Sequence, residues 1–181
     1  MDKILKFYDK KLIQFGDDAR AVGWRDKETQ WLRFKVLSEV TNLNGKTILD
    51  VGCGLGHFIA FLHGLGWHGK YTGWDICKSM IDECRHKYPK EDFNSLNLLE
   101  YDGENAFDIV LASGIFAIPI DDDEFYFNVM SKIFTLCREA VAVNFISTYV
   151  DYKEDYLNYT DPLKVFDFCK RNLTRFVTLR H

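Results

Sequence analysis

The stretch KTILDVGCGLGHF, residues 46–58, constrains the fold of this chain more than any other part of the sequence. A buried-strand pattern runs directly into three glycines at alternate positions, Gly52, Gly54 and Gly56, and a helical pattern follows. Glycine permits positive φ angles and lets a ligand approach the backbone closely. The free N–H groups that begin the next helix suit electron-rich ligand atoms. The stretch therefore predicts a ligand-binding turn, with a tight turn that binds nothing as the alternative.

Short apolar runs alternate with helical patterns along the chain, which is typical of a parallel sheet covered by helices on both faces. We expect strands at residues 46–51, 70–75, 92–97, 107–113, 139–147 and 175–181, and helices at 2–15, 25–41, 57–65, 78–88, 121–137 and 162–172. Because crossover connections are right-handed, the predicted class is α/β, with a doubly wound, mostly parallel sheet in three layers. Ligands on such sheets bind beyond the carboxyl ends of the strands, where the glycine turn also falls.

Length and composition indicate a single soluble domain spanning residues 1–181. Apolar residues make up 47% of the chain and charged residues 28%, and no apolar run reaches the ~20 residues that span a bilayer. Five cysteines without a C-x-x-C pair favour a reducing, cytoplasmic location over a disulfide framework or a zinc site. A net charge of −4 without a basic block disfavours nucleic acid as a partner. We therefore predict a small-molecule partner, and neither nucleic acid nor membrane.

Two acidic residues indicate which ligand the turn suits. Asp50 ends the first strand, where a carboxylate would repel the pyrophosphate of a dinucleotide but attract a cationic group. The glycine spacing also departs from the dinucleotide pattern G-x-G-x-x-G, because His57 stands at its last position. Asp75 ends the second strand 23 residues after Gly52, close to the ~20-residue offset of a ribose-binding carboxylate. Helix capping is the alternative role for Asp75.

Three stretches in order, LDVGCGLG, YTGWDICKSMI and FDIVLASGIF, resemble the class I S-adenosylmethionine-dependent methyltransferases, which have a Rossmann-like fold. The resemblance covers nearly the whole chain and implies an enzyme (EC 2.1.1.-) with S-adenosylmethionine as cofactor. The cofactor-binding residues that it implies are Asp50, Gly52, Cys53, Gly54, Gly56, Asp75, Ile76, Asn97, Leu98, Ser113 and Gly114. The loop and Asp50 would meet the amino acid end, and Asp75 the ribose. Asn97, where the family often has an acid, would meet the adenine amine.

The segment at residues 1–45 is predicted to form a helical cover over a Rossmann-like core at 46–181. Within it, Trp24, Arg25 and Gln30 offer a stacking surface, a fork for a carboxylate and a hydrogen bond. Core packing and a solvated face are the alternatives for the first two. His57 is a further substrate candidate, although packing beside the amino acid end of the cofactor is the favoured interpretation.

The sequence leaves the methyl acceptor and any catalytic base unassigned. LASGIF replaces the N/D-P-P-Y/F motif of amino-group methylation, and no Pro–Cys pair marks a cytosine methylase. We predict methyl transfer to a small molecule by in-line displacement. The acidic run at residues 121–124 is interpreted as a helix start, so no metal site is predicted.

Two other functions stay open. A nicotinamide-dependent oxidoreductase is disfavoured by the glycine spacing and by Asp50, and a cofactor-binding or interaction protein without turnover is the second alternative. The family usually inserts an antiparallel seventh strand between strands five and six, and residues 175–181 can supply only the sixth. We therefore expect the seventh strand to be lacking, with three explanations open: a shortened chain, a sheet closed by a partner, or direct pairing of strands five and six. If the sheet edge is open, we expect self-association through it.

Overall fold

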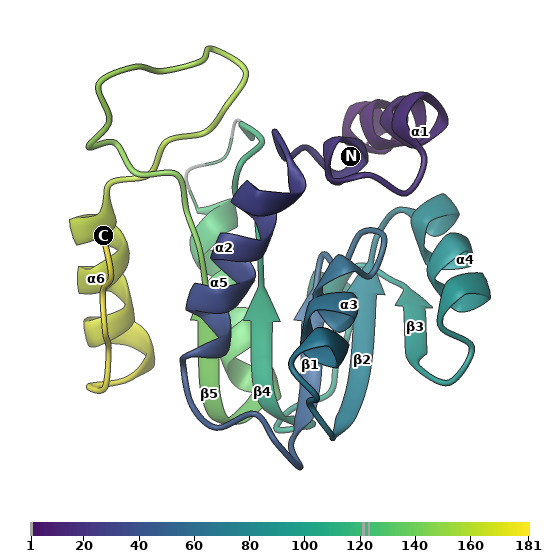
Figure 1. Cartoon of the computed structure of the whole chain (residues 1–181). Helices are drawn as coiled ribbons and strands as arrows, with labels where there is room; N and C mark the ends of the chain where they lie inside the picture. The colour runs from purple at the N-terminus through teal and green to yellow at the C-terminus, as the bar shows by residue number, and fades with distance from the viewer. Residues whose placement is uncertain (1, 121, 123) are drawn as a thin grey trace.

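The computed structural model describes residues 2–120, 122 and 124–181, with side chains from residue 4 onward. Its centre is a five-stranded parallel sheet in the order β3-β2-β1-β4-β5 (Figure 1). The strands are β1 (Thr47–Val51), β2 (Lys70–Asp75), β3 (Asp92–Ser95), β4 (Phe107–Ala112) and β5 (Cys137–Val143). The strand order reverses between β1 and β4, so a ligand-binding crevice is expected beyond the carboxyl ends of these two strands.

Helices cover both faces of the sheet, which confirms the predicted three-layer α/β class. On one face pack α2 (Lys27–Ser38), α3 (His57–Gly64) and α4 (Lys78–Lys87), and on the other α5 (Phe125–Leu136) and α6 (Pro162–Phe168). Neighbouring residues of β1 serve opposite cores, with Ile48 in the first and Leu49 in the second. Burial on both faces explains why the strand is nearly continuously apolar.

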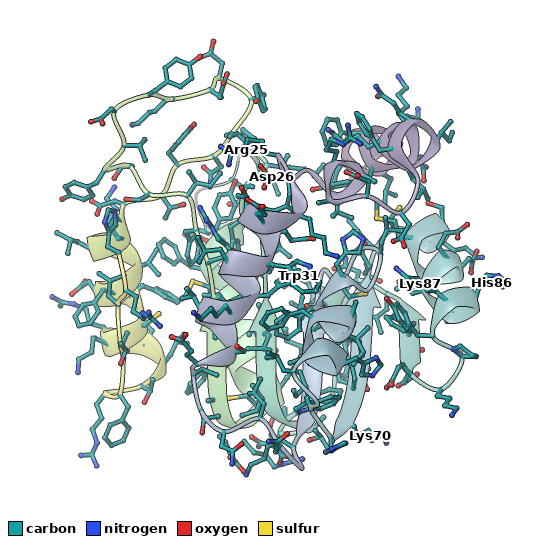
Figure 2. All side chains as sticks on the ribbon, in the orientation of Figure 1. Arg25, Asp26, Trp31, Lys70, His86 and Lys87 are labelled. Atoms are coloured by element: carbon teal, nitrogen blue, oxygen red, sulfur yellow. The ribbon has the colours of Figure 1, made fainter. Side chains whose placement is uncertain are left out.

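The N-terminal segment lies beyond the carboxyl ends of the strands. α1 (Asp2–Phe15) and the short 3₁₀ helix η1 (Ala19–Val22) form a third apolar cluster with the glycine loop and the start of α4 (Figure 1). α2 does not belong to this cluster, because it packs against one face of the sheet. The ring of Trp31 meets Phe61 of α3 edge-on, with centroids 5.5 Å apart, whereas Arg25 and Asp26 lie at the upper end of α2 (Figure 2).

Several predicted boundaries shift in the structure. α2 begins after Asp26, whose side chain accepts a hydrogen bond from the Thr29 N–H. β3 ends at Ser95, before the short 3₁₀ helix η2 (Leu98–Glu100), and α6 passes into a π turn, η3 (Cys169–Leu173). The helix predicted at 121–137 begins at Phe125, and residues 121 and 123 lie outside the described part of the chain.

The predicted sixth strand at residues 175–181 is wrong. This segment joins no sheet and is held by side chains near its end: Arg180 Nη1 lies 2.6 Å from Glu39 Oε2, and His181 Nε2 lies 2.7 Å from Ser147 Oγ. Contacts at one end do not align a backbone ladder, and Phe176 remains 77% exposed. Within the described residues, β5 pairs with β4 alone. Its second edge is therefore open, and self-association through it stays a prediction.

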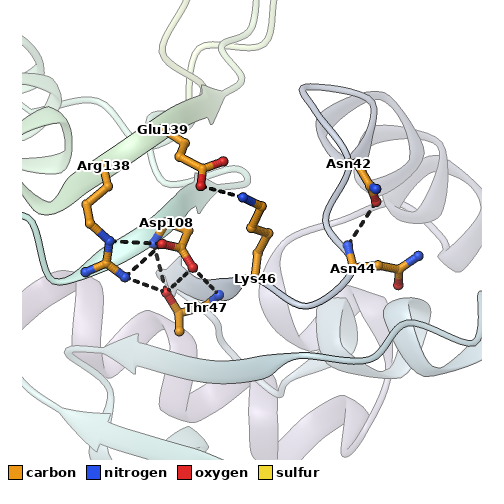
Figure 3. Close-up of polar contacts among 7 residues, drawn as sticks. All are labelled: Asn42, Asn44, Lys46, Thr47, Asp108, Arg138 and Glu139. Carbon is orange, nitrogen blue, oxygen red and sulfur yellow. Dashed lines mark hydrogen bonds and ion pairs between the residues drawn. The ribbon is translucent and has the colours of Figure 1, made fainter.

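A polar network ties β1, β4 and β5 together at their amino ends (Figure 3). Asp108 accepts hydrogen bonds from the Thr47 N–H and hydroxyl, both at 2.8 Å, and from Arg138 Nε at 2.9 Å. Arg138 also donates to the Thr47 hydroxyl at 3.1 Å, and Lys46 pairs with Glu139. The network fixes the strands at the end of the sheet opposite the glycine loop.

Candidate active site

The glycine loop joins β1 to α3 and is pinned to β2. Gly52, Gly54 and Gly56 have φ angles of +71°, +53° and +69°, a region that side chains other than that of glycine rarely adopt. The N–H groups of Gly52 and Cys53 both donate to the Trp74 carbonyl, at 2.7 and 3.1 Å. The predicted strand–glycine–helix turn is therefore present, with its backbone conformation fixed by hydrogen bonds to the neighbouring strand.

Side chains of the same protein approach this loop as closely as glycine allows. A methyl group at Gly52 would lie 2.2 Å from Ile115 Cγ2, and one at Gly54 would lie 2.7 Å from Val22 Cγ1. At Gly56 the nearest atom is Cε2 of Tyr88, at 3.0 Å. The bare backbone thus accommodates the close packing of Ile115, from the loop after β4, and of Val22, at the end of η1.

Asp75 links the end of β2 to the glycine loop. Its Oδ2 accepts the Gly54 N–H at 2.9 Å, and its Oδ1 accepts the Cys77 N–H at 2.8 Å. Burial raises the pKa of this carboxyl, against the lowering effect of these hydrogen bonds. A carboxylate has about four acceptor sites, and the backbone N–H of Ile76 also interacts with this carboxyl. Asp75 therefore holds the turn before α4, and its remaining acceptor capacity is available to a ligand hydroxyl.

Asp50 has a different environment from the one predicted for a ligand contact. Its carboxyl is only 3% exposed and accepts a hydrogen bond from the Tyr71 hydroxyl at 2.6 Å. Burial raises its pKa to about 7, although the Tyr71 hydrogen bond acts in the opposite direction. Any attraction to a cationic ligand would act through space from beneath the loop. Its role at the amino acid end of the cofactor stays a prediction.

The residues predicted to meet adenine follow β3 and β2. The Asn97 carbonyl caps η2 by accepting the Leu99 N–H at 3.1 Å, while its amide donates to Glu100. Leu98 is buried in the core beneath, and Ile76 is half-buried after Asp75. One acceptor site of the Asn97 carbonyl remains for an amine.

Ser113 and Gly114 end β4 and are held by a residue that the sequence reading did not single out. Asn144, directly after β5, accepts the Gly114 N–H at 2.8 Å through Oδ1 and donates to the Ser113 hydroxyl at 3.2 Å through Nδ2. β5 ends at Val143, four residues before the predicted end at residue 147. The side chain of Asn144, the next residue, reaches across to the end of β4. Its only sequence signal is a polar residue at the end of an apolar run.

The predicted substrate residues of the N-terminal segment separate into three environments. Trp24 lies over the end of β4, with Cζ2 3.1 Å from the position of a methyl group on Gly114. Gln30 is 3% exposed on the face of α2 that packs against the core. Arg25 is different, since its side chain is 83% exposed, pairs with Asp26 at 2.7 Å and donates to the Thr29 hydroxyl (Figure 2). The structure brings Trp24 to the crevice and leaves Arg25 in solvent.

His57 is the first residue of α3, and its side chain contacts the N-terminal segment. Its Nε2 lies 3.0 Å from Asp17 Oδ1, and Asp17 also accepts a hydrogen bond from Lys87 at 2.5 Å. His57 Nδ1 is buried and has no hydrogen-bond partner among residues 4–120, 122 and 124–181. Burial lowers the pKa of the imidazole below its usual value. These contacts make His57 an anchor for the segment that covers the loop.

Two negative findings apply to the described part of the chain. It has no group of three or more His, Cys, Asp or Glu side chains arranged to hold a metal ion. None of its helices is both long enough and apolar enough to cross a membrane.

Comparison with known families identifies the class of protein. Residues 48–140, just over half of the chain, match a family described as a methyltransferase domain. The chain belongs to this methyltransferase domain family. The predicted class, a class I S-adenosylmethionine-dependent methyltransferase enzyme with S-adenosylmethionine as its cofactor, is confirmed. The nicotinamide-dependent oxidoreductase alternative finds no support in this match.

The curated relatives differ in how much of their length the chain matches. It is 28% identical over 143 residues to "Putative methyltransferase Rv1506c" of Mycobacterium tuberculosis, covering 75% of this chain and 85% of that protein. It is 32% identical over 79 residues to trans-aconitate 2-methyltransferase of Escherichia coli, covering 44% of this chain and 31% of that enzyme. The second match is therefore confined to less than half of this chain.

Solved structures share the fold. Magnesium protoporphyrin IX methyltransferase (ChlM) from Synechocystis PCC 6803 with bound SAM superposes with a TM-score of 0.67 at 18% identity, covering 91% of this chain and 79% of that one. Phosphoethanolamine N-methyltransferase 1 of Haemonchus contortus gives 0.71 at 13% identity, covering 94% of this chain and 40% of that one. Identities of this size extend the likeness to the fold alone.

Proposed function

We propose that this protein transfers the methyl group of S-adenosylmethionine to a small-molecule acceptor that binds beyond the carboxyl ends of β4 and β5. The observation that carries the proposal is the Asp75 carboxylate. It accepts the Gly54 N–H and the Cys77 N–H at once, so it joins the glycine loop to the start of α4 and keeps acceptor capacity for a further donor. The ribose hydroxyls of the cofactor would be such donors.

The remaining cofactor residues follow from this placement. When bound, S-adenosylmethionine supplies an electrophilic methyl group on a positively charged sulfur. The loop backbone at Gly52, Cys53, Gly54 and Gly56 would lie along the amino acid end, with Asp50 beneath it and Ile76, Asn97 and Leu98 around the adenine. The buried Asp50 carboxyl, with its pKa raised to about 7, is poised to ionise when a positive charge arrives above it.

At the acceptor end, the protein supplies neutral polar groups and an aromatic wall. Asn144 orients the Ser113 hydroxyl, Trp24 closes over Gly114, and Gln30 is buried one helical turn before the core residue Phe34. Holding an acceptor in line with the methyl group is the main task of such an enzyme. A small acceptor is supported by the names of the relatives, which include trans-aconitate 2-methyltransferase and phosphoethanolamine N-methyltransferase. Arg25 can serve an acidic acceptor only by leaving Asp26.

Isothermal calorimetry with S-adenosylmethionine, S-adenosylhomocysteine and NAD tests the cofactor. We expect Asp75→Ala to weaken S-adenosylhomocysteine binding at least tenfold, about 1.4 kcal/mol, because it removes the acceptor for two hydroxyls. Asp82→Ala is the matched control, since Asp82 is a half-exposed acid on the outer side of α4 that pairs with Lys78. Equal binding by Asp75→Ala and the unaltered protein would remove the ribose assignment.

Turnover is tested separately from binding. Incubation with S-adenosylmethionine and a panel of small metabolites should release S-adenosylhomocysteine for at least one acceptor. Tight cofactor binding without release for any acceptor would favour the remaining alternative, a cofactor-binding protein without turnover.

A further inference from the structure

The helix α1 brings a polar side chain, that of Tyr8, into the apolar cluster beside the glycine loop. Tyr8 belongs to the apolar cluster that joins α1 to Leu55 of the glycine loop and to Cys77 and Met80 at the start of α4. Its ring is half-buried, and its hydroxyl lies 4.0 Å from the position of a methyl group on Gly23. Within residues 4–120, 122 and 124–181, Tyr8 has no side-chain hydrogen bond, and its hydroxyl is not fully buried. It therefore keeps a donor for a ligand.

The position of Tyr8 is fixed by contacts on both sides of it. Asp9, the next residue, accepts a hydrogen bond from the Ser79 hydroxyl at 2.6 Å and lies 3.6 Å from Cys77 Sγ. Beyond the end of α1, Asp17 binds His57 of α3 and Lys87 of α4. These bonds hold α1 over the start of α4 and beside the end of β2 (Figure 1).

The electrostatic surroundings agree with this location. Burial, together with the nearby charges of Asp75 and Cys77, raises the pKa of Tyr8 to about 12. The phenol consequently stays protonated at neutral pH. It can interact with the Asp75 carboxylate only as a hydrogen-bond donor, either directly or through a ligand hydroxyl that both groups contact.

We propose that Tyr8 is a cofactor-binding residue whose hydroxyl donates to the ribose held by Asp75. This assignment rests on the proposed function. The covering segment passes from Tyr8, next to Gly23, to Trp24, which lies on Gly114 at the end of β4. A ligand extended from the end of β2 to the end of β4 would thus be covered by a hydrogen-bond donor at its nucleoside end and by an indole at its methyl-donor end.

Calorimetry on the full chain tests the assignment with two probes, S-adenosylhomocysteine and 5′-methylthioadenosine. Both carry the ribose, but only the first carries the amino acid. We expect Tyr8→Phe, which keeps the ring, to weaken binding of both probes by about 3- to 10-fold, in line with the loss of one hydrogen bond. Tyr152→Phe is the matched control, because it removes the same hydroxyl from a side chain that is 72% exposed; its affinities should be unchanged.

The possible results separate the two proposals. A loss confined to S-adenosylhomocysteine would move the hydroxyl to the amino acid end and overturn the ribose assignment. Unchanged affinity for both probes would overturn the role of Tyr8 alone. If the unaltered protein bound neither probe, the proposed function would fail and this assignment with it. Asp9→Ala, which releases α1 from Ser79 while Tyr8 is intact, should also weaken both probes, and unchanged affinities there would contradict the cover.

Discussion

Asp50 is expected to lower the free energy of unfolding as the pH rises from 4 to 7, and Asp50→Asn is expected to remove most of this decrease. The Asp50 carboxyl is almost fully buried, and its pKa rises from 3.8 to about 7 on folding. A raised pKa means that the folded state holds a proton that the unfolded state has released throughout this range. The contribution of Asp50 to stability is therefore highest below pH 3.8 and falls as the pH rises toward 7, by about 1.4 kcal/mol per pH unit and about 4 kcal/mol in total.

Urea unfolding at several pH values, followed by tryptophan fluorescence, measures this effect. Asparagine keeps an acceptor for the Tyr71 hydroxyl, so the change removes the titration and little volume. Its free N–H₂ group adds a cost that does not depend on pH, about 1–3 kcal/mol. The difference between variant and unaltered protein should thus shift by about 2 kcal/mol in favour of the variant between pH 5 and pH 7. Asp75 has a raised pKa in both proteins, and its charge also contributes to raising the pKa of Asp50. A constant difference over this range would refute the argument that Asp50 is buried in its protonated form.

Two further substitutions test opposite ends of the sheet. Asp108→Ala should destabilise the protein by about 2–3 kcal/mol, because it leaves the Thr47 N–H and Arg138 without their acceptor; calorimetry should show unchanged S-adenosylhomocysteine affinity, and a weakened affinity would mean that the amino ends of the strands shape the site. Gly54→Ala should lower both the melting temperature and the cofactor affinity, since its φ is +53° and its new methyl would lie 2.7 Å from Val22. Adding Val22→Ala should recover part of the stability but not the affinity, and full recovery of binding would show that the glycine serves packing alone.

The sheet could be predicted where the chemistry is local. The bounds of β2 match the prediction, and those of β1 and β4 differ from it by one residue. Apolar runs ended by glycine or an acid require no knowledge of the rest of the fold. The strand predicted at residues 175–181 was wrong because strand formation there depends on the rest of the fold. FVTLRH has the composition of a strand, but a strand also needs a neighbouring edge in register, and Arg180 and His181 bind side chains instead.

Only part of the candidate site could be predicted from the sequence. Asp75 and the glycine loop lie together because the carboxyl ends of adjacent parallel strands coincide, which the pattern implies. The partner of Asp50 was not predictable, because Tyr71 reaches it from the neighbouring strand through a register that the sequence does not state. Asn144 was missed similarly, since it binds Gly114 and Ser113, which lie 30 and 31 positions away in the sequence.

The predicted site residues fall partly inside and partly outside the family match, and this division suggests which residues determine acceptor specificity. The family match at residues 48–140 contains β1 from its second residue, β2 to β4, the start of β5 and every cofactor residue predicted from the sequence. The covering elements α1 and η1, together with Trp24, Gln30 and Asn144, all lie outside it. Groups at the strand ends are held by the sheet, whereas groups brought by the covers depend on a few side-chain anchors such as Asp9 and Asp17. Family membership consequently accounts for the half of the site that would hold S-adenosylmethionine. We therefore expect substitutions at Trp24 and Gln30, which lie outside the match, to change substrate preference without loss of cofactor binding, whereas substitutions at Tyr8 and Asp9 of α1 should weaken cofactor binding.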